Sequence, residues 1–265
     1  MKPQEYSSII AGFVNGLNRG KSRYTGTCSG TVMHLKFSVN QWALWNLPPN
    51  ESPITAENVY SGKPSLDSLS GMVKRRMPGS AKAIQQLNDD HQWHQLPCVY
   101  ASKHAELSRT YKIIRQFNQD LSPALFSMSV HNAIPGLLSV INHDDSVYTV
   151  IDSMSGVIEM AVAEAVSWLS QYPKVKVVYF EEDSCTEAEL TEADKDSGMV
   201  LIMVIESGDD CTLSLESKSA ENQELKSNES NQNVTQLVNL LTGKQENYQN
   251  PQPRGLWQWQ RKPVL

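Results

Sequence analysis

The sequence lacks both a long basic tract and a long apolar run. The formal net charge is −6, which argues against a main role in binding nucleic acid by neutralising phosphates. A transmembrane helix needs about 20 apolar residues in succession, so no membrane span is expected. The first residues also lack the basic, apolar and small-residue regions of a secretion signal. We therefore expect a cytoplasmic protein.

The common cofactor and metal motifs are absent as well. Neither GxGxxG nor GxxxxGK[ST] occurs, so nothing supports a nucleotide site. His91 and His94 stand three residues apart, but no third metal ligand lies near them in the sequence. No CxxC spacing joins the four cysteines, which we interpret as free thiols: Cys28, Cys98, Cys185 and Cys211. No cofactor and no metal are expected.

The 265 residues are 40% hydrophobic and 20% charged, which is typical of a globular protein with one large or two small domains. Residues 1–32 are polar and rich in Gly, Ser and Asn, whereas a coherent apolar strand begins at Met33. The composition shift favours an N-terminal extension of 32 residues before one domain over 33–265. The alternative is an N-terminal helix that packs on the domain.

Strand and helix patterns alternate through the middle of the chain. Apolar runs predict strands at Cys98–Ser102, in DDSVYTVIDS and in YPKVKVVYFEED, the last of which suits a buried central strand. Helices are predicted at about 106–117, in the second part of SPALFSMSVHNAIPGLLSVINH with Asn132 as a cap, and over 156–171. Two further strands, GMVLIMVIES and CTLSLES, a helix in NVTQLVNLLTGK and an edge strand in RGLWQWQRK follow. The alternation predicts an α/β domain.

The turn Asp152-Ser153-Met154-Ser155-Gly156 joins a predicted strand to a predicted buried helix. Helix N-termini stabilise negative charge, so Ser153 or Ser155 is a candidate nucleophile there. A serine needs a base, for which His131 and His143 are candidates. The favoured interpretation is simpler: the two serines cap the helix.

Other polar residues carry weaker functional signals. His131 is a candidate base or oxyanion-binding group, but a hydrogen-bonded structural histidine is favoured, and His104 is similar. The basic triplet Lys74, Arg75 and Arg76 is a candidate contact for an acidic carrier, although such triplets usually form solvated helix faces. Trp42 and Trp45 are expected in the core or in an interface.

These segments together resemble a known family. SPALFSMSVHNAIPGLLSVINHDDSVYTVIDSMSGVIEMAVAEAV resembles the N-terminal half of β-ketoacyl synthases, which have the thiolase-like α/β fold with a mixed sheet and packed helices. The order from RRMPGSAKAIQQL through VYASKHAELSRT to WQWQR is similar to the short chain length factors of bacterial aryl polyene and related type II clusters. The resemblance covers about 33–265.

Two departures from the family bear on activity. The resemblance places Ser153 where a synthase has its reactive cysteine, and the family's further catalytic groups lie in a C-terminal half that this chain is too short to include. Condensation needs a thiolate to hold the acyl chain and histidines to stabilise the oxyanion. The resemblance therefore implies a chain-length-factor-like subunit, inactive alone, that pairs with an active β-ketoacyl-ACP synthase and also contacts acyl carrier protein.

The resemblance also implies where that partner binds. In the family two N-terminal halves meet through the strand before the nucleophile turn, which here consists of Val147, Tyr148, Thr149, Val150 and Ile151. An exposed sheet edge in a half-sized protein needs a partner to cover it. Two alternatives remain: a serine acyltransferase or thioesterase that uses Ser153 with His131, and a scaffold that binds acyl carrier protein through Lys74, Arg75 and Arg76.

Overall fold

A computed structural model describes residues 30–47, 56–66, 69–105, 107–116, 120, 122–153, 155–182, 198–217, 230–253 and 255–263. Within these residues one mixed sheet runs in the order β2-β1-β6-β5-β3-β4, and β8 and β7 extend it from β6. The strands are β1 (Gly30–Leu47), β2 (Val59–Ser61), β3 (Cys98–Ser102), β4 (Tyr148–Asp152), β5 (Lys174–Glu182), β6 (Gly198–Ser217), β7 (Asn247–Gln252) and β8 (Gly255–Arg261). The predicted α/β class is confirmed.

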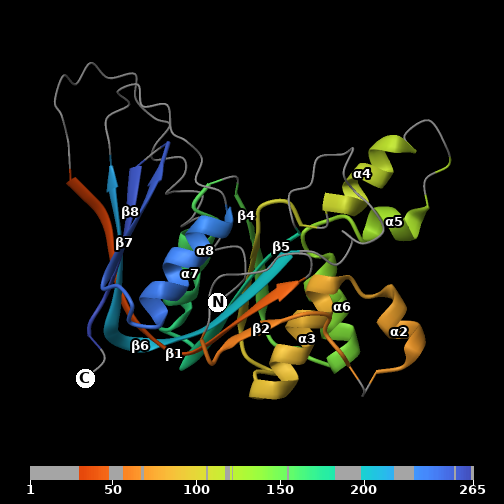
Figure 1. The fold of residues 1–265 in the computed structure, drawn as a ribbon, viewed down its shortest axis with the longest axis horizontal. Helices are drawn as coiled ribbons and strands as arrows, with labels where there is room; N and C mark the ends of the chain where they lie inside the picture. Colours follow the sequence, from red (N-terminus) through yellow and green to blue (C-terminus); the bar gives the residue numbers. More distant parts are fainter. Residues whose placement is uncertain are drawn as a thin grey trace.

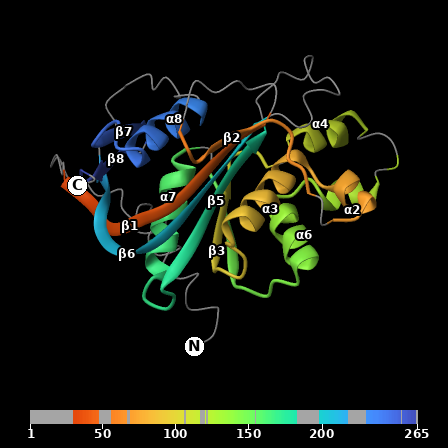
Figure 2. The ribbon, with the colours of Figure 1, turned by 60° about the horizontal axis from the view of Figure 1, so that its bottom comes forward.

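The helices lie in two layers on the central sheet (Figures 1 and 2). The helices α3 and α6 pack on one face with the apolar side chains of one core cluster, while α7 and α8 belong to the cluster on the other face. The helices are α2 (Gly71–Arg76), α3 (Gly79–His91), α4 (Leu107–Arg115), α5 (Pro123–Ser127), α6 (Ala133–Asn142), α7 (Val157–Trp168) and α8 (Ser230–Leu241). No described helix is long and apolar enough to cross a membrane.

Most predicted elements are present, with three differences. The two strands expected in GMVLIMVIES and CTLSLES form one strand, β6, because β1 pairs with it on both sides of an irregularity where Phe37 faces Cys211 and Ser38 faces Glu206. The predicted edge strand β8 pairs on both sides, with β6 and β7. The edge strand β7 was not predicted. It contains Pro251, which is tolerated because an edge strand has one unpaired side.

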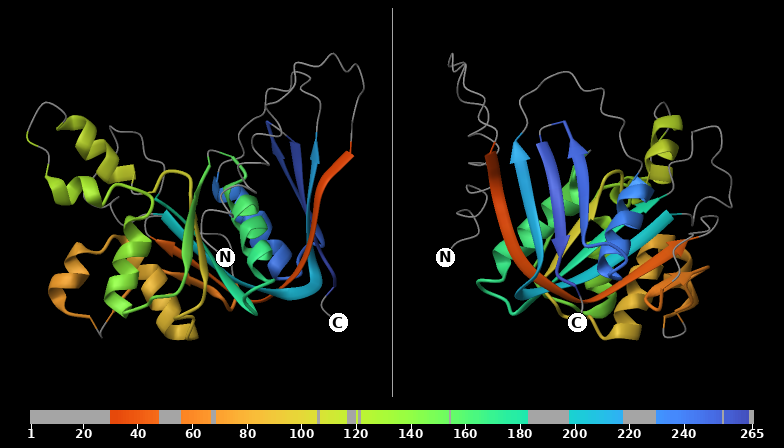
Figure 3. Two further views of the ribbon diagram at one scale, coloured as in Figure 1. Left: turned by 180° about the vertical axis from the view of Figure 1, so that it is seen from behind. Right: turned by 60° about the vertical axis from the view of Figure 1, so that its left-hand side comes forward.

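The irregularity between β1 and β6 curls the sheet (Figure 3). Gly208 lies in the unpaired stretch, and a Cβ there would lie 1.7 Å from the Ser38 Oγ, so only glycine allows this close approach. Beyond the irregularity β6, β8 and β7 turn over the α7 side of the central sheet, and α7 lies between the two parts. Trp257 and Trp259 of β8 belong to the same core cluster as α7.

The N-terminal part of the domain prediction lies mostly outside the described residues. Residues 1–29 are not described, and β1 begins at Gly30, three residues before Met33. The 32-residue extension therefore stays a prediction. Trp42 and Trp45 are both buried, in opposite clusters of the core, as one of the two interpretations expected.

The turn into α7 depends on Gly156. Its φ is +62°, and a Cβ there would lie 2.8 Å from Trp257 Nε1. Gly156→Ala is expected to lower the free energy of unfolding by about 1–3 kcal/mol, because alanine disfavours this backbone conformation and meets the indole. Urea denaturation measures the change.

Gly71→Ala is the matched control. Gly71 begins α2, and a Cβ there meets no atom within 4 Å. We expect no loss of stability, since alanine restricts the unfolded chain and favours helix. Equal stability of the wild-type protein and Gly156→Ala would contradict the role given to Gly156.

Candidate functional site

The nucleophile position lies where β4 ends and α7 begins. The strands β3, β4 and β5 run parallel, so their carboxyl ends meet at one edge of the sheet. The Ser153 hydroxyl donates to the Ser155 carbonyl oxygen at 2.7 Å and accepts the Ser155 N–H at 3.3 Å. The Ser153 proton is thus bound to a backbone carbonyl and not to a base.

The prediction that Ser153 and Ser155 cap the helix is wrong. The N-cap of α7 is Gly156, and no side chain caps the helix. Gly156 is in the left-handed conformation, which turns the chain so that Ser153 bonds to Ser155 instead of to the first helical N–H groups. The serines close the turn that precedes the helix.

His131 lies beside Asp152, one residue before Ser153. The His131 Nε2 is 3.6 Å from the Asp152 Oδ1, and this buried nitrogen has no hydrogen-bond partner among the described residues. His104 lies close to both groups: burial chiefly lowers the pKa of its imidazole, Lys103 and His131 lower it further, and Asp152 raises it. The structure brings His131, Asp152 and His104 together. Among the described residues, the hydrogen bonds of the Ser153 hydroxyl go to Ser155 and not to His131.

His143 does not belong to this group. It is the C-cap of α6 and precedes β4, whereas Ser153 follows β4. The histidine pair at α3 does not converge either: the His91 Nε2 bonds with the Tyr60 hydroxyl at 3.0 Å, and the His94 Nε2 bonds with the Asp89 Oδ1 at 2.8 Å. Over the described ranges, no three His, Cys, Asp or Glu side chains form a metal-binding group.

Glu181 is a buried carboxyl group at the same edge of the sheet. Its side chain is 5% exposed, and its Oε1 accepts from the Ser102 hydroxyl at 3.5 Å and from the backbone N–H of Lys103. Burial is the main effect on its pKa and raises it to about 7, while the backbone N–H groups of Lys103 and His104 oppose the rise. Sequence reasoning missed Glu181, although a charged residue near the end of a strand expected to be buried was a signal.

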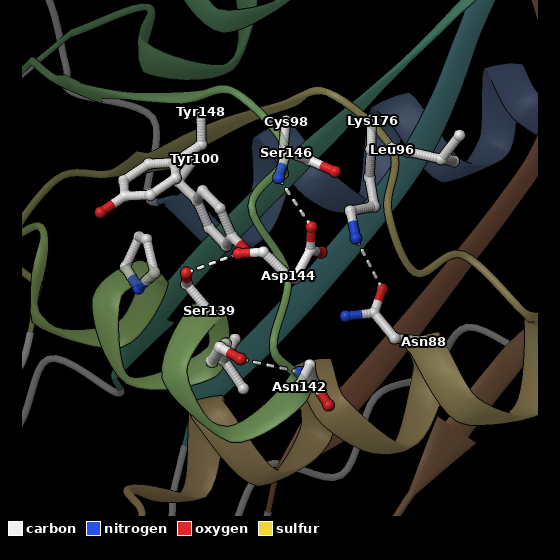
Figure 4. Close-up of a pocket in the computed structure, with 12 residues that line it drawn as sticks. Asn88, Leu96, Cys98, Tyr100, Ser139, Asn142, Asp144, Ser146, Tyr148 and Lys176 are labelled. Atoms are coloured by element: carbon white, nitrogen blue, oxygen red, sulfur yellow. Dashed lines mark hydrogen bonds between the residues drawn. The ribbon is translucent and has the colours of Figure 1, made fainter.

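A second polar site lies at the opposite end of the sheet, and it was also missed (Figure 4). The Lys176 Nζ donates to the Asn88 Oδ1 at 2.9 Å and to the Trp93 carbonyl oxygen at 2.8 Å. Burial lowers the pKa of Lys176, and the Asp144 carboxylate opposes this effect. The cavity beside it has a volume of about 20 Å³, which is enough for roughly one water molecule.

The β4 edge of the sheet is open and carries apolar side chains. Among the described strands β4 pairs only with β3. Val147 is 43% exposed and Tyr148 is 40% exposed, and Met160 of α7 and Val140 of α6 are also exposed. Such an edge is a template for pairing with another chain. The structure thus leaves uncovered the strand that the resemblance predicted as an interface.

The predicted carrier contact lies in α2. Lys74, Arg75 and Arg76 form the second half of α2, but the side chains of Arg75 and Arg76 lie outside the described residues. This contact stays a prediction.

The comparisons with known proteins agree with this geometry. The model of the "Beta-ketoacyl synthase, N-terminal domain" family matches residues 42–260. The chain therefore belongs to this family, and the resemblance stated from its sequence is confirmed. No curated relative matches the sequence.

Three solved structures are similar to the chain. A ketosynthase (ApeO) in complex with its chain length factor (ApeC) from Xenorhabdus doucetiae gives a TM-score of 0.62 at 20% identity, over 86% of this chain and 100% of the matched chain. The ishigamide ketosynthase/chain length factor gives 0.36 at 12% identity, over 45% and 39% of the two chains. A β-ketoacyl synthase from Burkholderia phymatum STM815 gives 0.41 at 11% identity, over 77% and 64%. The first match shows the ketosynthase-like fold.

The two described cysteines are unsuited to catalysis. Cys98 and Cys211 are buried free thiols, and burial raises their pKa values to about 12 and about 11. Because the thiolate is the reactive form, we expect iodoacetamide at pH 8 to leave both unmodified in the folded protein. Mass spectrometry of a Cys28→Ser/Cys185→Ser variant measures this directly.

The same variant in urea is the control, where both thiols should react fully. Modification of Cys98 or Cys211 in the folded protein at the rate of a free thiol would contradict the expected protection.

Proposed function

We propose that this protein is a non-catalytic, chain-length-factor-like subunit that pairs with an active β-ketoacyl-ACP synthase in polyene or fatty-acid-like type II biosynthesis in the cytoplasm. The observation that carries the proposal is the nucleophile turn of a ketosynthase-family fold with a serine in place of cysteine. The Ser153 hydroxyl is bound to its own turn, and no base contacts it in the described part of the chain.

The surroundings of the turn support the same function. The indole of Trp257 lies against Gly156 at the N-terminus of α7, the end of the helix that follows Ser153. Trp257 is itself buried, so side chains of this subunit fill the space beside the helix N-terminus. A bound acyl group would need that end of the helix for its oxyanion.

The open β4 edge supports the pairing with a synthase. The Cys98 N–H donates to the Val147 carbonyl oxygen, so in a parallel ladder the backbone groups of Tyr148 and Val150 point away from β3. A partner strand would satisfy them, and the neighbouring apolar side chains would be buried in the same contact. The matched chain from Xenorhabdus doucetiae is covered over 100% of its own length, and it comes from a solved complex of a ketosynthase with its chain length factor. Contact with acyl carrier protein through Lys74, Arg75 and Arg76 is part of the proposal.

Co-expression with the ketosynthase of the same gene neighbourhood tests the pairing. Size-exclusion chromatography with light scattering should show a 1:1 complex. A double variant, Val147→Lys with Tyr148→Lys, should weaken the complex at least about tenfold, because charges replace the exposed apolar side chains of the edge.

Ile114→Lys serves as the matched control, since Ile114 is an exposed apolar residue of α4. It should leave the affinity unchanged, and circular dichroism should show that all variants are folded. Equal affinity of the double variant and the wild-type protein would overturn the placement of the interface.

A serine acyltransferase or thioesterase is the second candidate function. The 3.6 Å distance between the His131 Nε2 and the Oδ1 of Asp152, the neighbour of Ser153, motivates it. Ser153→Ala should not change acyl-thioester turnover if the main proposal holds, since the Ser153 hydroxyl has no base. Turnover is measured with purified protein and an acyl-thioester substrate. A loss of turnover in Ser153→Ala, with none in Ser155→Ala, would favour the acyltransferase instead.

A further inference from the structure

One long stretch of the chain contains acidic side chains but no basic ones. Between Arg115 and Lys174 the sequence has no lysine and no arginine. The acidic residues of the stretch are Asp120, Asp144, Asp145, Asp152, Glu159 and Glu164. With no cation to offset them, they give the stretch a formal charge of −6, which equals the charge of the whole chain.

The fold places this acidic stretch around the open edge of the sheet. The stretch forms α5, α6, β4 and α7, and α6 and α7 lie beside β4 on the two faces of the sheet (Figures 1 and 3). Among the described strands β4 pairs only with β3. The backbone groups that a partner strand would pair with are therefore surrounded by elements that contain no lysine or arginine.

Exposed apolar side chains gather on the same elements. The described residues include seven exposed large apolar side chains, and all of them except Ile114 belong to this stretch. They are Phe126, Val130, Val140, Val147, Tyr148 and Met160. We call the part formed by Val140, Val147, Tyr148 and Met160 the β4 surface. An exposed apolar group of this kind marks a contact surface.

Acidic side chains lie at both ends of β4. Asp144 and Asp145 belong to the connection from α6 to β4, and Asp152 is the last residue of the strand. Asp145 and Asp152 are exposed. The β4 surface thus has an apolar centre and an acidic rim, which consists of Asp144, Asp145 and Asp152.

The two faces of the sheet both contribute to the β4 surface. Val140 lies on α6 and Met160 lies on α7, on opposite faces. A single extended peptide that paired with β4 would leave both of these side chains uncovered. A second sheet edge with helices on its own two faces would cover the strand and both side chains together.

We propose that the β4 surface binds a sheet edge of the partner synthase that has an apolar centre and a basic rim. This inference rests on the proposed function and adds the charge that the partner must carry. The same pattern selects against a second copy of this chain, because Asp145 and Asp152 of both copies would then share one contact. It also repels an acidic carrier, whose contact we place at Lys74, Arg75 and Arg76.

The charge of the rim acts mainly on the rate of association. Opposite charges on two approaching surfaces raise the rate of productive encounters, and salt screens this attraction. An apolar contact without complementary charges lacks this strong dependence on salt. The salt dependence of association therefore reports the sign of the partner's rim.

Stopped-flow association with the synthase of the same gene neighbourhood tests the proposal. Between about 0.02 M and about 0.5 M salt, we expect the association rate constant to fall at least about tenfold. The double variant Asp145→Asn with Asp152→Asn should associate about three- to tenfold more slowly at low salt and should depend less on salt. Light scattering of the protein alone at low salt should show a monomer.

Asp209→Asn with Asp210→Asn is the charge-matched control. Both residues are exposed on β6, which β5 and β3 separate from β4, so this variant should keep the wild-type rates.

Equal rates for the wild-type protein and a folded Asp145→Asn/Asp152→Asn variant would overturn the basic rim and leave the pairing intact. A homodimer that Val147→Lys with Tyr148→Lys dissociates would overturn the selection against a second copy. If no complex with the synthase forms at either salt concentration, the proposed function fails, and this inference fails with it.

Discussion

The burial of α7 on both sides is the constraint on which the rest of the structure depends. One side of the helix packs on β3 and β5, and the other meets the curled part of the sheet. Glu159, in the first turn, is buried there and accepts from the Asn250 Nδ2 at 2.9 Å and the Trp259 Nε1 at 3.2 Å. A buried carboxylate is costly without partners, so these bonds tie the C-terminal hairpin to the helix.

This enclosure explains how the chain buries an apolar helix in the middle of the domain. A helix that is apolar on nearly every side has to be covered on nearly every side. Here the chain covers it with its own β7, β8 and α8, and the sheet can reach around only because β1 and β6 are long and irregular at Ser38 and Gly208. The cover also places the buried Trp257 against Gly156 at the N-terminus of the helix.

The open edge of the sheet lies on the side away from this cover. The curl covers α7 but leaves β4 unpaired on one side, with Val147 and Tyr148 exposed. Glu181, His104, His131 and Asp152 lie at the carboxyl ends of the strands, close to the turn that follows β4. The exposed Val147 and Tyr148 lie at the start of β4, at the opposite end of the strand from these polar groups.

Local pattern determined much of this protein from the sequence alone. The α/β class and the β4–turn–α7 unit with its serines follow from periodicity and turn residues, which act over a few neighbours. The resemblance to the family then marked Ser153 as the position of the nucleophile. Only the tertiary structure decided that β6 is one bent strand, that β8 is covered by β7, and that Glu181 and Lys176 are buried with partners. These features depend on contacts between residues far apart in the chain, such as Glu181 with Lys103 or Lys176 with Asn88, and no local pattern records which distant donor or acceptor a buried charge will meet.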